Sequence, residues 1–253
     1  MQGFRISTPA HGPGMSTPPC SLGTMPRTAR ASKGGVIYHV LNRGNRRAAV
    51  FHNETDYSEF ERAIGLTCDR LPMPVLAYCL MPNHFHLVLL PHRDGDLSDW
   101  MRLLLNIHVR RHHKRHGTDG RIWQGRFKAF PVCPDNHLLR VTRYVERNAL
   151  RANLVARAED WRWGSLHWLA YGLRPAILVD GPLDRPDDWL ERVNTPETPE
   201  ELQALRRSTK RGSPFGPEDW VEKAAVELGL EFTMREQGRP RKKEPTRGEP
   251  LKF

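Results

Sequence analysis

The stretch Met81-Pro82-Asn83-His84-Phe85-His86-Leu87-Val88-Leu89-Leu90 places two histidines on either side of one apolar residue, at the start of a hydrophobic run. A short apolar run that follows a turn is typical of a buried strand. Because side chains alternate between the faces of a strand, we expect His84 and His86 to point one way and Phe85 the other. Two imidazoles held side by side on a rigid strand make half of a metal site. Chance is the alternative, since the chain has 12 histidines.

The segments on either side of this strand predict an α+β fold. Hydrophobic patterns indicate strands over 36–41, 75–80, 84–90 and 126–132, and helices over 54–71, 97–116 and 136–150. The order strand, helix, strand, strand, helix, strand is ferredoxin-like. We therefore expect a ferredoxin-like antiparallel sheet with flanking helices, in which the sheet carries the histidines and the last helix lies against it.

Composition divides the chain into four predicted segments. Residues 1–34 are rich in Pro, Gly, Ser and Thr, and we expect a disordered N-terminal extension there. Residues 35–175 form the core domain, and residues 176–211 are predicted to be a linker. Residues 212–253 are expected to hold a DNA-binding amphipathic helix and a basic tail. In that tail Gly238-Arg239-Pro240-Arg241-Lys242-Lys243 resembles an AT-hook, and a plain solvated tail is the alternative.

The helix expected over 136–150 carries the second half of a candidate site. Asp135 can cap this helix, on which Tyr144 and Asn148 lie one turn apart on the same face. A phenol and a carboxamide would thus project together toward the sheet. Plain packing of Tyr144 and a capping or surface role of Asn148 are the alternatives, and Glu146 could substitute as a ligand.

These motifs, taken in order along the chain, resemble the single-tyrosine HUH transposases, and among them the REP-associated tyrosine transposases of bacteria. Ala149 departs from the pattern, because relatives often carry proline after the asparagine. The resemblance rests on Tyr38-His39-Val40-Leu41-Asn42-Arg43-Gly44-Asn45, Met81-Pro82-Asn83-His84-Phe85-His86, Trp123-Gln124-Gly125-Arg126-Phe127 and Arg143-Tyr144-Val145-Glu146-Arg147-Asn148.

The resemblance implies the HUH nuclease fold and a nicking and strand-transfer activity on single-stranded DNA hairpins such as REP elements. Tyr144 would be the nucleophile that forms a 5′-phosphotyrosine, and His84, His86 and Asn148 would be the metal ligands. A ligand set without thiolate favours Mg²⁺ or Mn²⁺ over structural Zn²⁺. REP-associated relatives also suggest a monomer. Two alternatives stay open, namely an inactive DNA- or RNA-binding regulator on the same fold and a hydrolytic metalloenzyme.

The charge of the chain independently favours a nucleic-acid partner. The formal net charge is +10, with Lys+Arg 39 against Asp+Glu 29. A membrane partner is disfavoured because no apolar stretch reaches the roughly 18 residues of a span, and the mean hydropathy is −0.61. The 4 cysteines form no C-x-x-C pair, so we expect a cytoplasmic, nucleoid-associated protein with reduced thiols.

Several basic and polar side chains are candidates for DNA contacts, with a solvated surface as the alternative for the basic helix and a core position as the alternative for the tryptophan. The helix over 97–116 is expected to adjoin the site. The candidates are Arg43, Asn45, Arg46 and Arg47; Arg110, Arg111, Lys114 and Arg115; Trp123, Arg126 and Lys128; and Arg239, Arg241 and Lys242.

Overall fold

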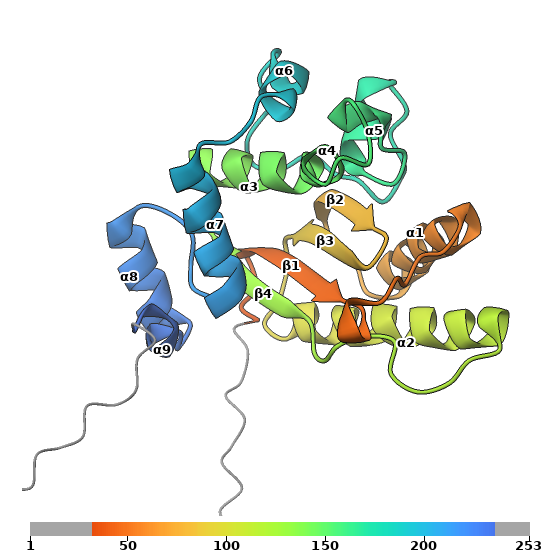
Figure 1. Cartoon of the computed structure of the whole chain (residues 1–253). Helices are drawn as coiled ribbons and strands as arrows, with labels where there is room; N and C mark the ends of the chain where they lie inside the picture. The colour runs from red at the N-terminus through yellow and green to blue at the C-terminus, as the bar shows by residue number, and fades with distance from the viewer. Residues whose placement is uncertain (1–31, 236–253) are drawn as a thin grey trace, which may run out of the picture.

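A four-stranded antiparallel sheet forms the centre of the computed structural model, which describes residues 32–235 (Figure 1). The strands lie in the order β2-β3-β1-β4, which is the ferredoxin-like arrangement predicted from the sequence. Most of the predicted N-terminal extension, and the tail with Arg239, Arg241 and Lys242, lie outside the described residues. The strands are β1 (Ile37–Arg43), β2 (Val75–Met81), β3 (His84–Leu89) and β4 (Lys128–Val132).

Helices cover both faces of the sheet (Figure 1). On one face lie α1 (Glu54–Arg70) and α2 (Asp96–His116), and on the other lie α3 (Asn136–Glu146) and the short α4 (Asn148–Arg151). None of the helices in the described part of the chain is long and apolar enough to cross a membrane.

The alternation of side chains along β3 fills both layers. Phe85 and Leu87 pack into the core between the sheet and α1/α2, which also holds Trp100. Val88 points to the other face and packs with residues of α3 such as Val141. A strand buried on both sides has little freedom to slip, because a shift by one residue would exchange its two faces. The residues that alternate with Phe85 and Leu87 are therefore fixed on the α3 face.

Capping side chains begin the helices where the sequence predicts. The Asn53 carboxamide accepts a hydrogen bond from the backbone N–H of Asp56, and the Asp135 carboxylate accepts one from His137. The prediction of one continuous helix over 136–150 is wrong at a single residue: α3 ends at Glu146, and α4 begins at Asn148.

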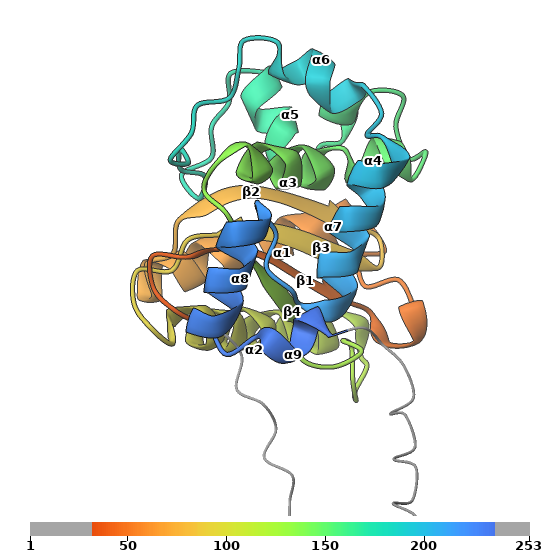
Figure 2. The ribbon, with the colours of Figure 1, turned by 90° about the vertical axis from the view of Figure 1, so that its left-hand side faces the viewer.

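Apart from η1, which lies between β1 and α1, the remaining elements follow β4 in the chain (Figure 2). The segment 176–211 is not the predicted linker, because it contains α6 and α7, and Trp189 and Val193 of α6 are buried. Its prolines were misleading, since Pro199 stands in the first turn of α7, where no hydrogen bond is lost. The elements are η1 (Asn45–Arg47), η2 (Ala158–Asp160), α5 (Ser165–Ala170), α6 (Trp189–Asn194), α7 (Pro199–Arg211), α8 (Glu218–Glu227) and α9 (Glu231–Met234).

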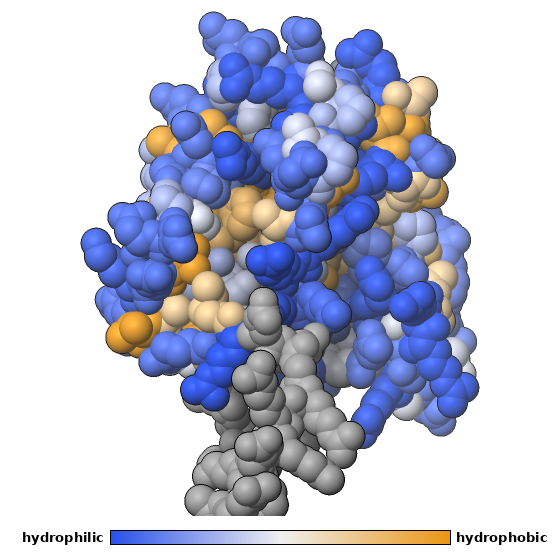
Figure 3. All heavy atoms as spheres, turned by 60° about the vertical axis from the view of Figure 1, so that its left-hand side comes forward, coloured by the Kyte–Doolittle hydropathy of each residue, from blue (hydrophilic) through white to orange (hydrophobic). Residues whose placement is uncertain are grey.

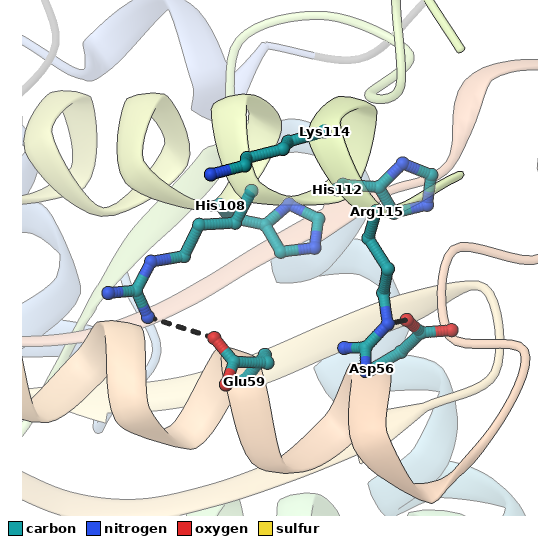
Figure 4. Close-up of a pocket in the computed structure, with 7 residues that line it drawn as sticks. Asp56, Glu59, His108, His112, Lys114 and Arg115 are labelled. Atoms are coloured by element: carbon teal, nitrogen blue, oxygen red, sulfur yellow. Dashed lines mark hydrogen bonds and ion pairs between the residues drawn. The ribbon is translucent and has the colours of Figure 1, made fainter. Parts of the chain in front are cut away.

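Ion pairs and hydrogen bonds join α1 to the C-terminal half of α2 (Figure 4). Arg111 pairs with Glu59 at 3.0 Å, and the buried Asp56 carboxylate accepts hydrogen bonds from His116 Nε2 and from the His52 backbone N–H, both at 2.8 Å. These contacts surround a cavity of about 370 Å³ between the two helices. Two arginines of α2, Arg111 and Arg115, therefore neutralise carboxylates of α1.

We expect Asp56→Asn to lower the free energy of unfolding by about 1.5–3 kcal/mol near pH 7, the range for hydrogen bonds to charged groups. Burial alone would raise the pKa of Asp56, but its hydrogen bonds from His52 and His116 hold that pKa below its ordinary value. The carboxylate thus stabilises the fold above the unfolded-state pKa of about 3.9, and this stabilisation is lost as the pH falls through the folded-state pKa. Urea unfolding at several pH values measures it.

The difference between Asp56→Asn and wild type should shrink as the pH is lowered toward about 3. The exposed Asp69→Asn substitution on the same helix is the control and should change little. A difference that stays constant with pH would contradict this role of the carboxylate.

Candidate active site

A cleft of about 630 Å³ opens on the α3 face of the sheet. Its walls come from β1, β3, the segment before β4, the junction of α3 with α4, and α7. The cleft brings together all four residues predicted as catalytic or metal-binding: His84, His86, Tyr144 and Asn148.

The two histidines of β3 lie side by side, with ring centroids 5.0 Å apart. His84 Nδ1 lies 2.6 Å from the Asn83 side-chain oxygen, so Nδ1–H donates and the Nε2 lone pair is left free. Burial lowers the pKa of His84 to about 4, and burial also lowers the pKa of His86 well below its ordinary value. Both rings are therefore neutral near pH 7 and can act as lone-pair donors.

His39 of β1 supports His86 from behind. The two residues are diagonal neighbours across the paired strands, since His39 lies opposite Val88. His39 Nε2 lies 2.8 Å from His86 Nδ1, and the two rings are stacked. When His86 Nδ1–H donates to His39 Nε2, the lone pair of His86 is on Nε2, as it is on His84. This tautomer places the His39 proton on Nδ1, a buried atom for which the described part of the chain offers no hydrogen-bond partner.

Tyr144 lies across from this histidine pair. Its ring centroid is 5.9 Å from that of His86, and the rings meet edge to face. The guanidinium of Arg151 lies over the Tyr144 ring, 4.1 Å from the centroid, and donates to the Tyr144 carbonyl at 3.3 Å. Glu197 holds Arg151 in place through an ion pair of 3.0 Å. The Tyr144 ring thus lies between the neutral imidazole of His86 and the Arg151 guanidinium, in the cleft that His84 also lines.

Other tyrosines are poorly suited to act as nucleophiles. Burial raises the pKa of Tyr38 and of Tyr57 to about 12. The hydroxyl of Tyr78 donates to Glu61 at 2.7 Å inside the fold. Tyr171 is exposed, and like the other three it does not line the cleft.

Asn148 begins α4 on the wall of the cleft. Its side chain is buried, and the carboxamide nitrogen has no hydrogen-bond partner within residues 32–235. An unpaired buried amide is costly, by about 1–3 kcal/mol, unless something else satisfies it. The amide is thus available to a group that enters the cleft.

The side chains in the cleft that can act as metal ligands suit an open site for a divalent cation. Two imidazole nitrogens and a carboxamide are present, and within the described range no three His, Cys, Asp or Glu side chains converge to hold a metal. These residues could hold a divalent cation and would leave several of its coordination positions open for phosphate oxygens and water. They do not fit a closed structural zinc site.

Glu146 is a structural residue, so the prediction that it could substitute as a ligand is wrong. Its carboxylate is buried on the side of α3 away from the cleft. It accepts hydrogen bonds from Ser165 at 2.8 Å, Trp189 at 2.7 Å and Arg185 at 3.0 Å. Every one of these partners comes from the chain after α4, so Glu146 ties that region to α3.

The predicted DNA contacts divide into two groups. Arg43, Arg126 and Lys128 line the cleft, and η1, with Asn45, Arg46 and Arg47, follows directly after Arg43. In the other group, the expectation that α2 adjoins the site is wrong, because α2 packs on the opposite face of the sheet (Figure 1). The residues placed there are Arg110, Arg111, Lys114 and Arg115.

Trp123 is a core residue rather than a platform for an unpaired base. Its side chain is buried between Phe51, Phe60 and Phe85, on the α1/α2 side of the sheet. The core alternative weighed from the sequence is therefore the correct one.

Sequence reasoning missed four functional candidates: Arg151, and Arg206, Thr209 and Lys210 of α7. A signal for Arg151 existed, since it follows Tyr144 by seven residues, or two helical turns. Arg143 and Arg147 stand closer to the tyrosine in sequence, but Arg143 donates to the Thr195 carbonyl just after α6 and Arg147 donates to the Val193 carbonyl in the last turn of α6. No local sequence pattern predicts that α7 lines the cleft, because the tertiary fold alone brings it there.

Comparisons with known proteins find a likeness to transposases. The family model described as "Transposase IS200 like" matches residues 32–148. A curated Haemophilus influenzae protein, provisionally named a REP-associated tyrosine transposase, is 26% identical over 148 residues, which span 54% of this chain and 82% of that protein. A solved REP-associated tyrosine transposase bound to a REP hairpin shares 25% identity, with a TM-score of 0.48 over 62% of this chain and 92% of that one. Residues 32–148 are therefore similar to the IS200-like transposases, in agreement with the resemblance predicted from the sequence.

Replacing Glu146 with alanine should lower the free energy of unfolding by about 3–5 kcal/mol, because it removes a buried acceptor of three hydrogen bonds and leaves the half-buried Arg185 without its ion-pair partner. Chemical unfolding followed by circular dichroism measures this loss. Glu222→Ala on the exposed side of α8 serves as the control and should change stability by less than about 0.5 kcal/mol. A Glu146→Ala variant as stable as wild type would restore the ligand alternative.

Proposed function

We propose that the protein nicks and rejoins single-stranded DNA next to hairpins of the REP type, with Tyr144 as the nucleophile. One observation carries this proposal: the phenol of Tyr144 and the neutral imidazoles of His84 and His86 line the same cleft. A side chain used only for packing has no need of a flanking histidine pair and guanidinium.

His84, His86 and Asn148 would hold the divalent cation, Mg²⁺ or Mn²⁺. When bound, the ion supplies positive charge that polarises the scissile phosphate. The chain prepares this site in advance. Asn83 and His39 fix the two rings through Nδ1, and such partners orient metal-binding histidines and set their tautomers.

Tyr144 Oη would attack the phosphorus of the scissile phosphodiester. The new O–P bond replaces the bond between phosphorus and the 3′ oxygen, the phenol loses its proton, and the departing oxygen gains one to become a free 3′-OH. The product is a 5′-phosphotyrosine, in which the phosphoester energy is kept. Attack by a different 3′-OH reverses the step, so strands can be transferred without ATP.

Arg151 is suited to assist this step. Its guanidinium over the Tyr144 ring can stabilise the negative charge that develops as the phenol is deprotonated. The ion pair with Glu197 fixes its position. Arg43, Arg126 and Lys128 on the same cleft can contact phosphates of the strand, and η1 can reach bases that are not paired.

Incubating the protein with Mn²⁺ and an end-labelled hairpin oligonucleotide with single-stranded flanks should yield an adduct that survives denaturation. Tyr144→Phe removes only the nucleophilic oxygen and should lower adduct formation by about 1,000-fold or more. Tyr171→Phe, at an exposed tyrosine outside the cleft, is the matched control and should react like wild type.

The outcomes also separate the other candidate functions. Tight hairpin binding with no adduct across varied hairpins would favour a binding-only regulator. Metal-dependent cleavage without a covalent intermediate would favour a hydrolytic enzyme. An undiminished adduct on Tyr144→Phe would show that another residue is the nucleophile.

Binding of the metal can be measured without DNA. His84→Gln should weaken Mn²⁺ binding, followed by the loss of the free-ion electron paramagnetic resonance signal, by about tenfold or more. His92→Gln, at an exposed histidine outside the cleft, should bind Mn²⁺ like wild type. Equal affinities of the two variants would remove the histidine pair from the metal site.

A further inference from the structure

Helix α7 forms one wall of the cleft, although it lies beyond residues 32–148 of the transposase match. Figure 2 shows α7 beside β4 and below α4, and in Figure 3, where this side comes forward, much of the surface is hydrophilic. The side chains that α7 presents to the cleft are those of Arg206, Thr209 and Lys210.

The position of α7 is fixed by other residues. Leu205 is buried in the core on the α3 face of the sheet. Thr198 and Glu201 form a capping box at its first turn, and Glu201 also pairs with Arg143 at 3.7 Å. The helix ends at Gly212, whose φ of 76° is readily adopted by glycine. Arg206, Thr209 and Lys210 are thus not needed to hold α7 in place.

No residue in the range that the structure describes is a hydrogen-bond or ion-pair partner of these three side chains. Within the described part of the chain, neither Arg206 nor Lys210 makes a hydrogen bond or ion pair. The Thr209 hydroxyl is buried and has no hydrogen-bond partner among residues 32–235. This contrasts with α2, where Arg111 and Arg115 are paired with carboxylates of α1. A buried, unsatisfied hydroxyl between two free cations is the donor set that a phosphate group requires.

We propose that Arg206, Thr209 and Lys210 form a phosphate-binding wall for the single strand that enters the cleft. The strand would pass between α7 and the β4 side of the cleft, where Lys128 contributes a further cation. This inference rests on the proposed function, because it assigns the same cleft a second set of DNA contacts. The contacts are to the backbone, so they add affinity and position without reading sequence.

Binding of a fluorescein-labelled oligothymidylate of about 20 nucleotides tests the proposal, since phosphate contacts do not depend on sequence. Arg206→Ala with Lys210→Ala should weaken binding about tenfold at moderate salt. Loss of two phosphate contacts should also reduce the slope of log affinity against log salt by about 1.4, at about 0.7 per contact on single strands. Thr209→Val should weaken binding severalfold and leave the slope unchanged.

Arg207→Ala is the matched control, because Arg207 is the exposed neighbour of Arg206 and does not line the cleft. It should keep the affinity and slope of wild type. The proposal is overturned if Arg207→Ala weakens binding as much as Arg206→Ala, or if the double variant binds like wild type. Thermal unfolding of each variant should match wild type, since these side chains do not anchor α7.

The adduct assay separates this inference from the proposed function. At saturating DNA, the Arg206→Ala, Lys210→Ala variant should still form the adduct on Tyr144. If the wild-type protein forms the adduct and the double variant binds oligothymidylate as wild type does, the α7 wall is rejected and the proposed function stands. A wild-type protein that neither binds oligothymidylate nor forms an adduct would reject both.

Discussion

The alternation of side chains along β3 is the constraint on which the candidate site depends. Phe85 and Leu87 are buried against α1 and α2, so His84 and His86 can only face α3. Pairing with β1 then brings Nε2 of His39 to 2.8 Å from Nδ1 of His86. The strand register that buries Phe85 and Leu87 thus also places His84 and His86 on the α3 face. A slip of one residue would move both sets of side chains to the wrong face.

Positive charge is used in two different ways on the two faces of the sheet. On the α1/α2 face, Arg111 and Arg115 neutralise buried or half-buried carboxylates and so contribute to the fold. On the α3 face, Arg43, Arg126 and Lys128 line the cleft, and α7 adds two cations that have no partner within the described residues. The net charge of +10 therefore says less about DNA binding than the distribution of the unpaired cations does.

The local part of this arrangement could be predicted from the sequence. The period of two at His84-Phe85-His86 and the caps at Asn53 and Asp135 depend on near neighbours in the chain, and the structure agrees with each of them. The errors concern long-range packing. The sequence around Trp123 is equally compatible with a buried and an exposed side chain, and only the tertiary fold shows that it is buried. The approach of α7 to Tyr144 joins segments more than 50 residues apart, and no periodicity encodes it.

Identifying the atom that carries the DNA tests the central claim most directly. After the reaction with hairpin DNA, digestion with nuclease and trypsin followed by mass spectrometry locates the modified residue. The account predicts a nucleotide attached to the peptide Tyr144-Val145-Glu146-Arg147, on the phenolic oxygen. A nucleotide attached to any other residue, or cleaved DNA with no modified peptide, would contradict it.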